Sequence, residues 1–451
     1  MQQSSAQMNL QPWRRLFAKR SIRKRRCPCA VAPSKRVCAS STATHWLVFG
    51  GFSVRQNRPW RMPDQELSAP PLKGKRILII SQRHLNPVLE RNIRYLVGQG
   101  AALDVVCLRG TSPRHPIPGA RIYGLPLVHR RSHLVRYLAE YGLFFVVAGA
   151  FSLLLTRRHQ YSVVEVDNLP DFLVFSALPA RFRKCRIVLF MYELIPDMVI
   201  ARVARANHPL VRLTSAVERL ATHWVDHVIT VSEPCRRRLA TRGTDPNRVT
   251  VLPNAQPGIN CSPRDLPESP LLVTHGTIVE RYGVDVAIRA VSCLRQKWPD
   301  LMLEVLGEGE QLPALKQLVC DLGLARHVRF EPFTAWQVAI QRIRRATLGI
   351  VPVLADGYGE LLLPTKLLEY ALHGIPAVCS NVPAIAEYFP PDSVAYFTPG
   401  SHLELAQQID RLLANPEEAQ ELARRASEAL RRISWEQAAP DYVSALGLSA
   451  A

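Results

Sequence analysis

The residues best suited to chemistry lie in one stretch of the C-terminal half, residues 347–380. It has the pattern of an apolar strand, a glycine-containing loop, a short helix that ends at Gly374 and a second apolar strand. On the helix, Lys366, Glu369 and His373 follow at i, i+3 and i+7 and share one face, opposite a predicted buried stripe of leucine and alanine. The stretch thus brings a cation, a carboxylate and free backbone N–H groups to the mouth of a parallel sheet, which suits an anion such as diphosphate.

The segment LPTKLLEYALHGIPAV, residues 363–378, resembles the donor site of the group 1 glycosyltransferases. These form a large GT-B family of retaining nucleotide-sugar transferases, and the resemblance extends over residues 75 to 440. It implies a fold of two doubly wound, Rossmann-like α/β domains that face a cleft. The alternative is an ordinary surface ion pair between Lys366 and Glu369 without a ligand, which the neighbouring loop, strands and motifs disfavour.

A chain of 451 residues is too long for one core, so we expect two domains with additional segments. Both domains should show the strand and helix alternation of a doubly wound sheet. The expected segments are a basic extension (1–70), an acceptor-side domain (71–255), a linker (256–270), a donor-binding domain (271–432) and a helix returning to the first domain (433–451).

The formal charge of +20 is concentrated at the N-terminus. Residues 1–61 contain thirteen Lys and Arg and no Asp or Glu. Three interpretations of this head are open: a targeting peptide, a basic arm that binds nucleic acid or anionic lipid, and a disordered extension without function. Nucleic-acid binding by the rest of the protein is unlikely because little excess charge remains there, so deleting the head should abolish any such binding.

The cysteine pattern indicates reduced thiols in a cytoplasmic protein. The ten cysteines are scattered, and Cys27 and Cys29 have neither the spacing nor the partners of a zinc site. The uncharged run 141–156 is shorter than the ~20 residues that cross a bilayer. We therefore predict no transmembrane span over the apolar stretch 134–155. A buried crossover helix and a helix in contact with the inner face of the membrane remain equally open.

The first half should place polar residues at the carboxyl ends of its strands, where open parallel sheets bind ligands. The strand 186–191 leads into Tyr192 and Glu193. In the family this strand end commonly carries an Asp, a His and an acidic residue that point at the cleft. Glu193 matches that pattern, whereas Phe190 and Tyr192 depart from it. The alternative is a plain helix N-terminus, although the Tyr192 hydroxyl could hydrogen-bond to a sugar.

The second half begins with the strand 271–275, and its glycines predict close backbone approach. The resemblance makes Gly276 and Thr277 donor-binding residues, although the family usually has Arg at the position of Thr277. Arg281 is the cation that remains to grip phosphate, and a solvated loop arginine is the alternative. Gly307, in the sequence Gly-Glu-Gly after a predicted strand, is expected to let the backbone approach a ligand.

The expected mechanism places charge opposite the leaving diphosphate. We assign this role to Arg281 and Lys366, assisted by backbone N–H groups near Pro364 and Thr365. The resemblance implies that Glu369 accepts hydrogen bonds from the ribose and that the anomeric carbon retains its configuration. It also implies that no cofactor or obligatory metal is needed. The family commonly has two glutamates separated by seven residues.

Here eight residues separate Glu360 from Glu369, so Glu360 is either a donor-binding partner or a cap of the loop. Two other functions share the expected fold. An epimerase or phosphorylase would use the donor without a sugar acceptor, and a degenerate subunit would bind the sugar nucleotide without transfer. The sequence leaves open the nucleobase, the sugar and the acceptor, which could be a glycan or a lipid-linked molecule.

Overall fold

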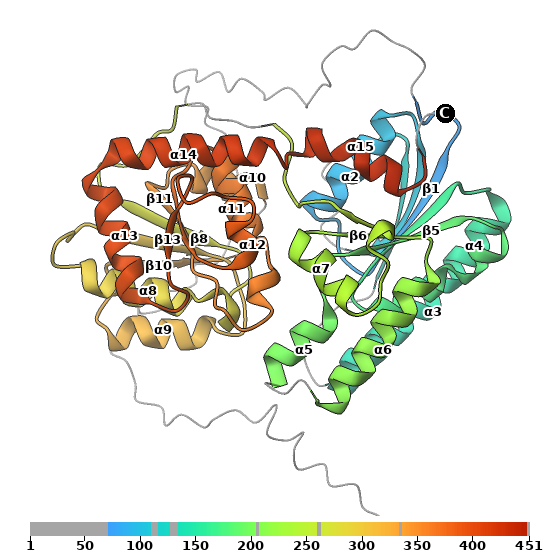
Figure 1. Cartoon of the computed structure of the whole chain (residues 1–451), viewed down its shortest axis with the longest axis horizontal. Coiled ribbons are helices and arrows are strands. Elements are labelled where there is room, and N and C mark those ends of the chain that lie inside the picture. The colour runs from blue at the N-terminus through green and yellow to red at the C-terminus, as the bar shows by residue number, and fades with distance from the viewer. Residues whose placement is uncertain are drawn as a thin grey trace, which may run out of the picture. The chain divides into compact units, whose positions relative to one another are not determined.

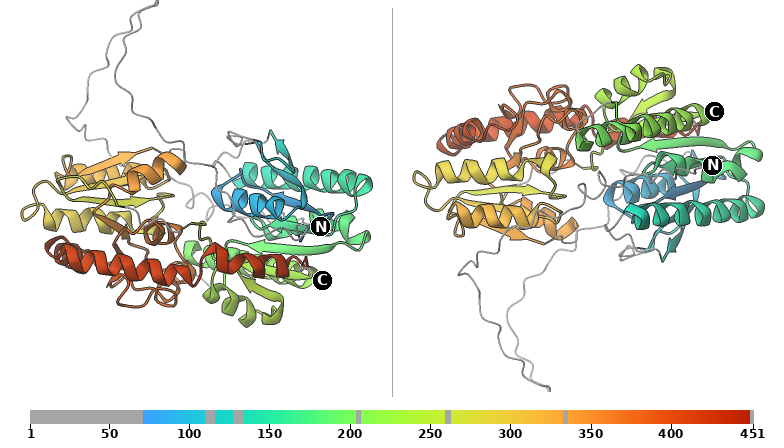
Figure 2. Two further views of the ribbon diagram at one scale, coloured as in Figure 1. Left: turned by 90° about the horizontal axis from the view of Figure 1, so that it is seen from above. Right: turned by 90° about the horizontal axis from the view of Figure 1, so that it is seen from below.

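The computed structural model describes residues 71–109, 116–126, 134–203, 207–258, 263–332 and 336–448 (Figure 1). The side chains of residues 134–138 and of Gln337 are not among those described. The predictions made for the basic extension 1–70 therefore fall outside the described residues. Within them the chain forms two parallel sheets, each of which is flanked by helices (Figure 2).

The first sheet has the strand order β3-β2-β1-β4-β5-β6-β7 within the described residues, and all its neighbouring strands are parallel. Its central strands β1, β4 and β5 are buried almost throughout, as expected where helices cover both faces. The strands are β1 (Arg76–Ser81), β2 (Ala102–Leu108), β3 (Ala120–Leu125), β4 (Val163–Asp167), β5 (Arg186–Met191), β6 (His227–Thr230) and β7 (Val249–Val251).

The connections of the first sheet are mostly helical, and α2 begins at a cap that the sequence supplies. The Asn86 side chain accepts hydrogen bonds from the Val88 and Leu89 N–H groups, and Pro87 stands at the first helical position. The helices are α2 (Pro87–Gly98), α3 (Leu134–Arg158), η1 (Asp171–Ala177), α4 (Leu178–Phe182), α5 (Ile195–Val203), α6 (Pro209–Trp224), α7 (Glu233–Thr241) and η2 (Pro246–Arg248).

The second sheet has the order β10-β9-β8-β11-β12-β13 within the described residues and is also parallel. Its strands are β8 (Leu271–His275), β9 (Met302–Leu306), β10 (Val328–Glu331), β11 (Leu348–Val351), β12 (Ala377–Ser380) and β13 (Ala395–Phe397). Its helices are η3 (Glu280–Tyr282), α8 (Val284–Leu294), α9 (Leu312–Asp321), α10 (Trp336–Ile343), η4 (Gly359–Leu361), α11 (Thr365–Leu372), α12 (Pro383–Ala386), α13 (His402–Ala414) and α14 (Pro416–Arg431).

The predicted fold class of two doubly wound α/β domains is confirmed. The sequence analysis missed β3, because this edge strand is only partly buried and lacks a continuous apolar run. The polar stretch that follows β13 forms two helices, α13 and α14. They are separated at Asn415, because Pro416 cannot donate the hydrogen bond that would continue α13.

The last helix, α15 (Trp435–Ala445), packs against the first sheet at β6 and β7. The Tyr442 hydroxyl donates a hydrogen bond to the fully buried Glu165 carboxylate of β4 at 2.8 Å. The Arg91 guanidinium of α2 lies 3.9 Å from the centre of the Trp435 ring and donates to the Ala255 carbonyl. This helix thus completes the core of the N-terminal sheet with residues from the far end of the chain.

Helix α3 is 25 residues long, so it exceeds the uncharged run on which the prediction of no transmembrane span rested. By length and composition its segment Ala139–Arg158 could cross a membrane, and it is the one such helix among the described residues. One side of α3 belongs to the core of the first sheet, where Phe144 and Ala148 are fully buried. A spanning helix would have to give up this packing.

The buried cysteines of the described residues carry free thiols: Cys107 in β2, Cys185 just before β5, Cys235 in α7 and Cys379 in β12. Burial raises the pKa of Cys107 and of Cys235 to about 11. These two thiols are therefore protonated at neutral pH and serve as small core residues.

Candidate active site

The predicted donor-site residues gather where the second sheet reverses its strand order, between β8 and β11. Ligands of open parallel sheets bind at such a point, outside the carboxyl ends of the strands. Strand β8 ends at His275 and leads through Gly276 and η3 into α8, while β11 leads through a loop and η4 into α11. The two loops are tied together because the Leu354 N–H donates to the Arg281 carbonyl at 2.8 Å.

Arg281 lies in η3 and is held by the loop that follows β11. Its Nε is 3.2 Å from Asp356 Oδ2, and its guanidinium carbon lies 4.4 Å from the centre of the Tyr358 ring. Asp356 also accepts the Tyr358 and Gly359 N–H groups at 3.1 and 2.6 Å. The cation is thus oriented by a carboxylate that simultaneously shapes the loop.

Lys366 occupies the first turn of α11 and is 5% exposed. Its ammonium nitrogen lies 4.7 Å from the centre of the Tyr282 ring, next in sequence to Arg281. Burial lowers the pKa of Lys366 to about 8, although the Glu369 carboxylate acts in the opposite direction. The positive charge of Lys366 is therefore only partly compensated by protein groups, and an anionic ligand beside it would stabilise the charged form.

The start of α11 has no side-chain cap. Pro364 is the N-cap residue, and no side-chain cap is formed among the described residues at the start of the helix, which begins at Thr365. These N–H groups and the positive end of the helix dipole therefore lie beside the Lys366 ammonium. Lys366 and Arg281 thus both lie beside Tyr282, one over its ring and the other next to it in sequence.

Glu369 is engaged by protein groups from two other elements. Its Oε1 accepts a hydrogen bond from Trp336 Nε1 of α10 at 3.0 Å, and its Oε2 lies 3.2 Å from His275 Nε2. The His275 contact is close but lacks the alignment of a hydrogen bond. Burial lowers the pKa of His275 to about 3, so this histidine is neutral, and burial raises the pKa of Glu369 to about 7.

The sequence analysis missed His275 and Trp336. The signal for His275 was its position as the last residue of a strand beside a glycine, where ligand sites form. The signal for Trp336 was weaker, because nothing in the local sequence relates α10 to the Glu369 side chain. In this conformation, a ribose hydroxyl that donates to the Glu369 carboxylate would do so alongside the hydrogen bond from Trp336.

The face of α11 that carries Lys366, Glu369 and His373 is largely enclosed, like the leucine and alanine stripe opposite it. Both Lys366 and His373 are buried, and helix α11 is enclosed on most sides because α14 packs on it opposite the strands. His373 follows the helix as its C-cap, with both ring nitrogens unpartnered among the described residues. Burial lowers the pKa of His373 to about 4, so it contributes no positive charge to the site.

The glycines after β8 and β9 approach each other rather than open space. A Cβ atom on Gly307 would lie 1.9 Å from the Gly276 carbonyl oxygen, and both glycines have positive φ. Gly307 is therefore required for backbone packing, and its close approach to a ligand stays a prediction. Thr277 is exposed beside this crossing.

Asp356 takes the loop-capping role that was one of the two options for Glu360. Glu360 lies in the short helix η4 and is partly exposed. The signal for Asp356 was the Asp-Gly pair in the loop, since aspartate side chains commonly accept N–H groups two and three residues ahead. With the cap assigned to Asp356, the donor-binding alternative for Glu360 stays a prediction.

At the first sheet, Tyr192 is enclosed. Its ring stacks on Phe190 with centroids 4.2 Å apart, and the Arg83 guanidinium carbon lies 4.4 Å from its centre. The hydroxyl oxygen is inaccessible and has no hydrogen-bond partner among the described residues. A hydrogen bond from Tyr192 to a sugar would therefore require this segment to open.

Glu193 is partly exposed and faces the loop of the second sheet. Its carboxylate accepts a hydrogen bond from the Tyr358 hydroxyl at 3.4 Å, and Tyr358 in turn lies against Arg281. Ser232, after β6, donates a hydrogen bond to the Leu361 carbonyl at 3.0 Å. Residues at the strand ends of the first sheet thus contact the segment that also orients a predicted phosphate-binding cation.

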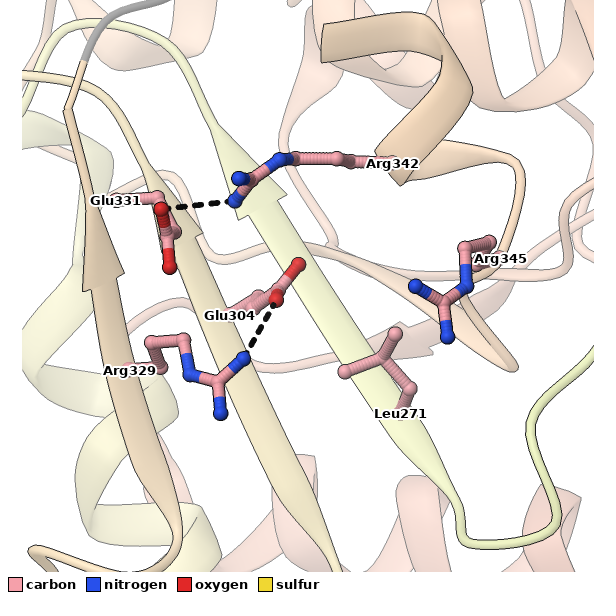
Figure 3. A pocket seen from close by; sticks show the side chains of 6 residues that line it. All are labelled: Leu271, Glu304, Arg329, Glu331, Arg342 and Arg345. Atoms are coloured by element: carbon pink, nitrogen blue, oxygen red, sulfur yellow. Dashed lines mark ion pairs between the residues drawn. The ribbon is translucent and has the colours of Figure 1, made fainter. Parts of the chain in front are cut away.

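A separate pocket of about 170 Å³ lies over strands β8 to β10 and contains none of the predicted site residues (Figure 3). Arg342 pairs with Glu331 at 2.8 Å and Arg329 with Glu304 at 3.7 Å, so its charges are largely compensated. The lining residues are Leu271, Glu304, Arg329, Glu331, Arg342 and Arg345. We do not associate this pocket with the donor.

Comparisons with known proteins match both halves of the chain. Residues 263–429 match the family described as glycosyl transferases group 1, and residues 85–255 match the glycosyl transferase 4-like domain. The structure is similar to the sucrose-phosphate synthase of Thermosynechococcus elongatus, with a TM-score of 0.63 and 18% identity over 83% of this chain and 100% of that one.

The curated relatives are distant. The GDP-mannose-dependent alpha-(1-6)-phosphatidylinositol monomannoside mannosyltransferase of Mycolicibacterium smegmatis is 27% identical over 39% of this chain and 47% of that protein. The D-inositol 3-phosphate glycosyltransferase of Rhodococcus jostii is 26% identical over 44% of this chain and 46% of that protein. The chain spans about half the length of these two relatives.

The two parallel sheets, with the candidate site at the switch point of the second, define a GT-B protein. The matches to both halves of the chain make the assignment more specific. The chain belongs to the group 1 glycosyltransferase family.

Proposed function

We propose that this protein transfers a sugar from a nucleotide-diphosphate sugar to a hydroxyl group of a glycan or lipid-linked acceptor. The observation that carries the proposal is the buried, weakly compensated Lys366 ammonium beside the uncapped N-terminus of α11, with Arg281 on the adjoining loop. A diphosphate supplies the negative charge that this arrangement lacks. Synthesis of a polysaccharide or glycoconjugate is the expected context.

The chemistry follows from where charge develops. As the anomeric C–O bond breaks, the departing diphosphate gains negative charge, which Arg281, Lys366 and the first N–H groups of α11 stabilise. Removing one such donor typically lowers the rate by roughly 10²–10³. Since these groups supply the positive charge, we propose that transfer needs no metal. We also propose retention at the anomeric carbon, with the departing phosphate taking the acceptor proton.

The donor can be identified by thermal-shift screening against uridine, guanosine and adenosine diphosphate sugars. The relative from Mycolicibacterium smegmatis is named for GDP-mannose, and a structural neighbour from Anabaena is described in complex with UDP-glucose. We expect stabilisation by one nucleotide class, which the Lys366→Ala variant loses. Equal stabilisation of that variant would contradict the assignment of Lys366.

Transfer itself is tested with the identified donor, lipid-linked and glycan acceptors, and excess chelator. The proton NMR coupling of the new anomeric centre reports its configuration, and we expect the same configuration as in the donor. Incubation with the donor alone separates the alternatives within this fold. Epimerised sugar or release that depends on inorganic phosphate would indicate an epimerase or a phosphorylase.

A sugar-nucleotide-binding subunit without activity is the second candidate. The enclosed Tyr192 hydroxyl and the threonine at position 277 favour it, because both replace groups that the family commonly uses. Its signature would be donor binding without transfer or donor hydrolysis, unchanged in Tyr192→Phe and Glu193→Gln variants. An active enzyme should instead lose transfer on substitution of Glu193.

A further inference from the structure

Helix α3 carries an apolar stripe on the side that faces away from the sheet. Its exposed residues follow at spacings of three and four, which puts them on one face of the helix. The large ones are Leu143 (51% exposed), Val146 (64%) and Leu154 (51%). The exposed residues from position 139 to position 154 are all apolar: Ala139, Leu143, Val146, Ala150, Leu153 and Leu154.

The stripe continues onto α4, which packs beside α3 (Figure 1). There Leu178 is 44% and Phe182 is 80% exposed. The segment is fixed to α3, because Arg183 Nη2 donates to the Thr156 carbonyl at 3.2 Å. Phe182 thus extends the apolar stripe of α3 into a larger apolar surface, and such surfaces on soluble proteins mark sites of protein or membrane interaction.

Cations border this apolar surface. Arg157 and Arg158 end α3, and Arg183 and Lys184 follow α4, all of them exposed. The sequence has no Asp or Glu in residues 141–162 or 172–186, whereas it has six Lys and Arg there. An apolar face edged by cations is the pattern of a helix that lies in the interface of an anionic membrane.

A basic pocket adjoins the arginine end of α3. It has a volume of about 360 Å³, and its lining includes Lys75, Arg76, Arg158 and His159. Arg76 is compensated by Asp104 at 2.9 Å, whereas Lys75 and Arg158 are exposed and form no ion pair within the described residues. The pocket therefore carries uncompensated positive charge, and it lies next to the C-terminal end of the apolar stripe of α3.

We propose that the surface formed by the α3 stripe and Phe182 docks the protein onto an anionic lipid bilayer, with lipid phosphates at the basic border. The basic head 1–61 is an unsuitable cover, because its charge has the same sign as the border. A second copy would likewise oppose cations to cations. The other side of α3 stays in the core of the sheet, so the helix lies in the interface and does not span the bilayer.

This docking surface would also place the candidate site relative to the membrane. Helix α3 connects the carboxyl end of β3 to the amino end of β4. Its N-terminal end thus lies at the edge of the sheet that carries Tyr192 and Glu193. With α3 in the membrane plane, a lipid-linked acceptor would reach that edge without leaving the bilayer.

The test is vesicle co-sedimentation of the full chain, with phosphatidylcholine alone or with added phosphatidylglycerol. Because the positive charge of the head 1–61 would attract anionic lipid in every variant, the comparison is between variants that all retain it. We expect Val146→Glu with Leu154→Glu to weaken binding to anionic vesicles at least roughly tenfold. The matched control is Leu403→Glu, which changes a leucine of similar exposure (59%) on α13 and should bind as the wild type does.

A second variant addresses the border without altering the apolar packing. Arg157→Gln with Arg158→Gln should weaken binding to anionic vesicles roughly tenfold and leave binding to phosphatidylcholine unchanged. Unchanged binding of both double variants to anionic vesicles would overturn the proposal. So would a change in the solution mass of the Val146→Glu, Leu154→Glu variant without vesicles, since it would indicate a second copy on this face.

The outcome is independent of the proposed function. The docking variants should keep the thermal shift that the donor gives, because their substitutions lie outside the second sheet. If the donor shift is absent from the wild type, the proposed function fails while the vesicle result stands. If vesicle binding fails while the donor shift persists, only the docking proposal is lost.

Discussion

Replacing Lys366 by methionine should make the empty protein more stable and abolish its response to the donor. Burial lowers the pKa of Lys366 from 10.5 to about 8. At 1.36 kcal/mol per pKa unit, the charged form costs the folded state about 3 kcal/mol at pH 7. Methionine fills a similar volume without this cost.

The expected gain is smaller than 3 kcal/mol, because the substitution also removes the attraction between Lys366 and Glu369. A gain of 1–2 kcal/mol would raise Tm by roughly 2–8 °C for a domain of this size. Scanning fluorimetry at pH 7, with and without the identified nucleotide sugar, measures both effects. The control is Lys297→Met, an exposed lysine paired with Asp410, which should change stability by no more than about 0.5 kcal/mol.

The reasoning fails if the Lys366→Met variant melts below the wild type and still responds to the donor. That result would make Lys366 a structural residue whose charge is satisfied within the protein. A lower Tm together with a lost response would retain the ligand role but contradict the claimed cost of burial. A higher Tm with a lost response is the outcome that the structure leads us to expect.

Three further results are expected. Donor affinity, measured by titration calorimetry from pH 6 to 9, should fall above pH 8 as Lys366 loses its proton and below pH 7 as Glu369 gains one; a flat profile would exclude both groups from binding. Trp336→Phe removes the indole N–H that donates a hydrogen bond to Glu369. It should change the affinity for the nucleotide sugar with little effect on Tm, and an unchanged Kd would place the tryptophan outside the site. Burial raises the pKa of Glu165 from 4.5 to about 8. As the pH rises through this range, the carboxyl group would ionise in the unfolded chain first, so the folded state loses stability. Glu165→Gln should therefore melt above the wild type at pH 9 and near it at pH 5, and a lower Tm at pH 9 would refute this account.

The described fold follows closely from local sequence signals. Strands β5 and β8 coincide with the predicted strands 186–191 and 271–275, which are mostly apolar. A strand buried on both faces leaves a continuous hydrophobic run, so its limits can be found without tertiary information. The edge strand β3 has no such run, and it was missed for that reason.

The candidate site was only partly predictable. Lys366 and Arg281 were found because cations in glycine-containing loops after strands are local features. The partners that orient them were not found, since Asp356 approaches Arg281 from a loop 75 residues away in sequence. Tyr192 was expected at the surface, but stacking against Phe190 encloses it.

The sequence alone determined the alternation of strands and helices, the family and the cations available to a diphosphate, because each depends on residues close together in the chain. Only the tertiary structure decided that Trp336 and His275 contact the Glu369 carboxylate, and that α3 exposes one apolar side while it buries the other. Such pairings depend on which elements become neighbours when the sheets form, and that is a property of strand order and of the twist of the sheet.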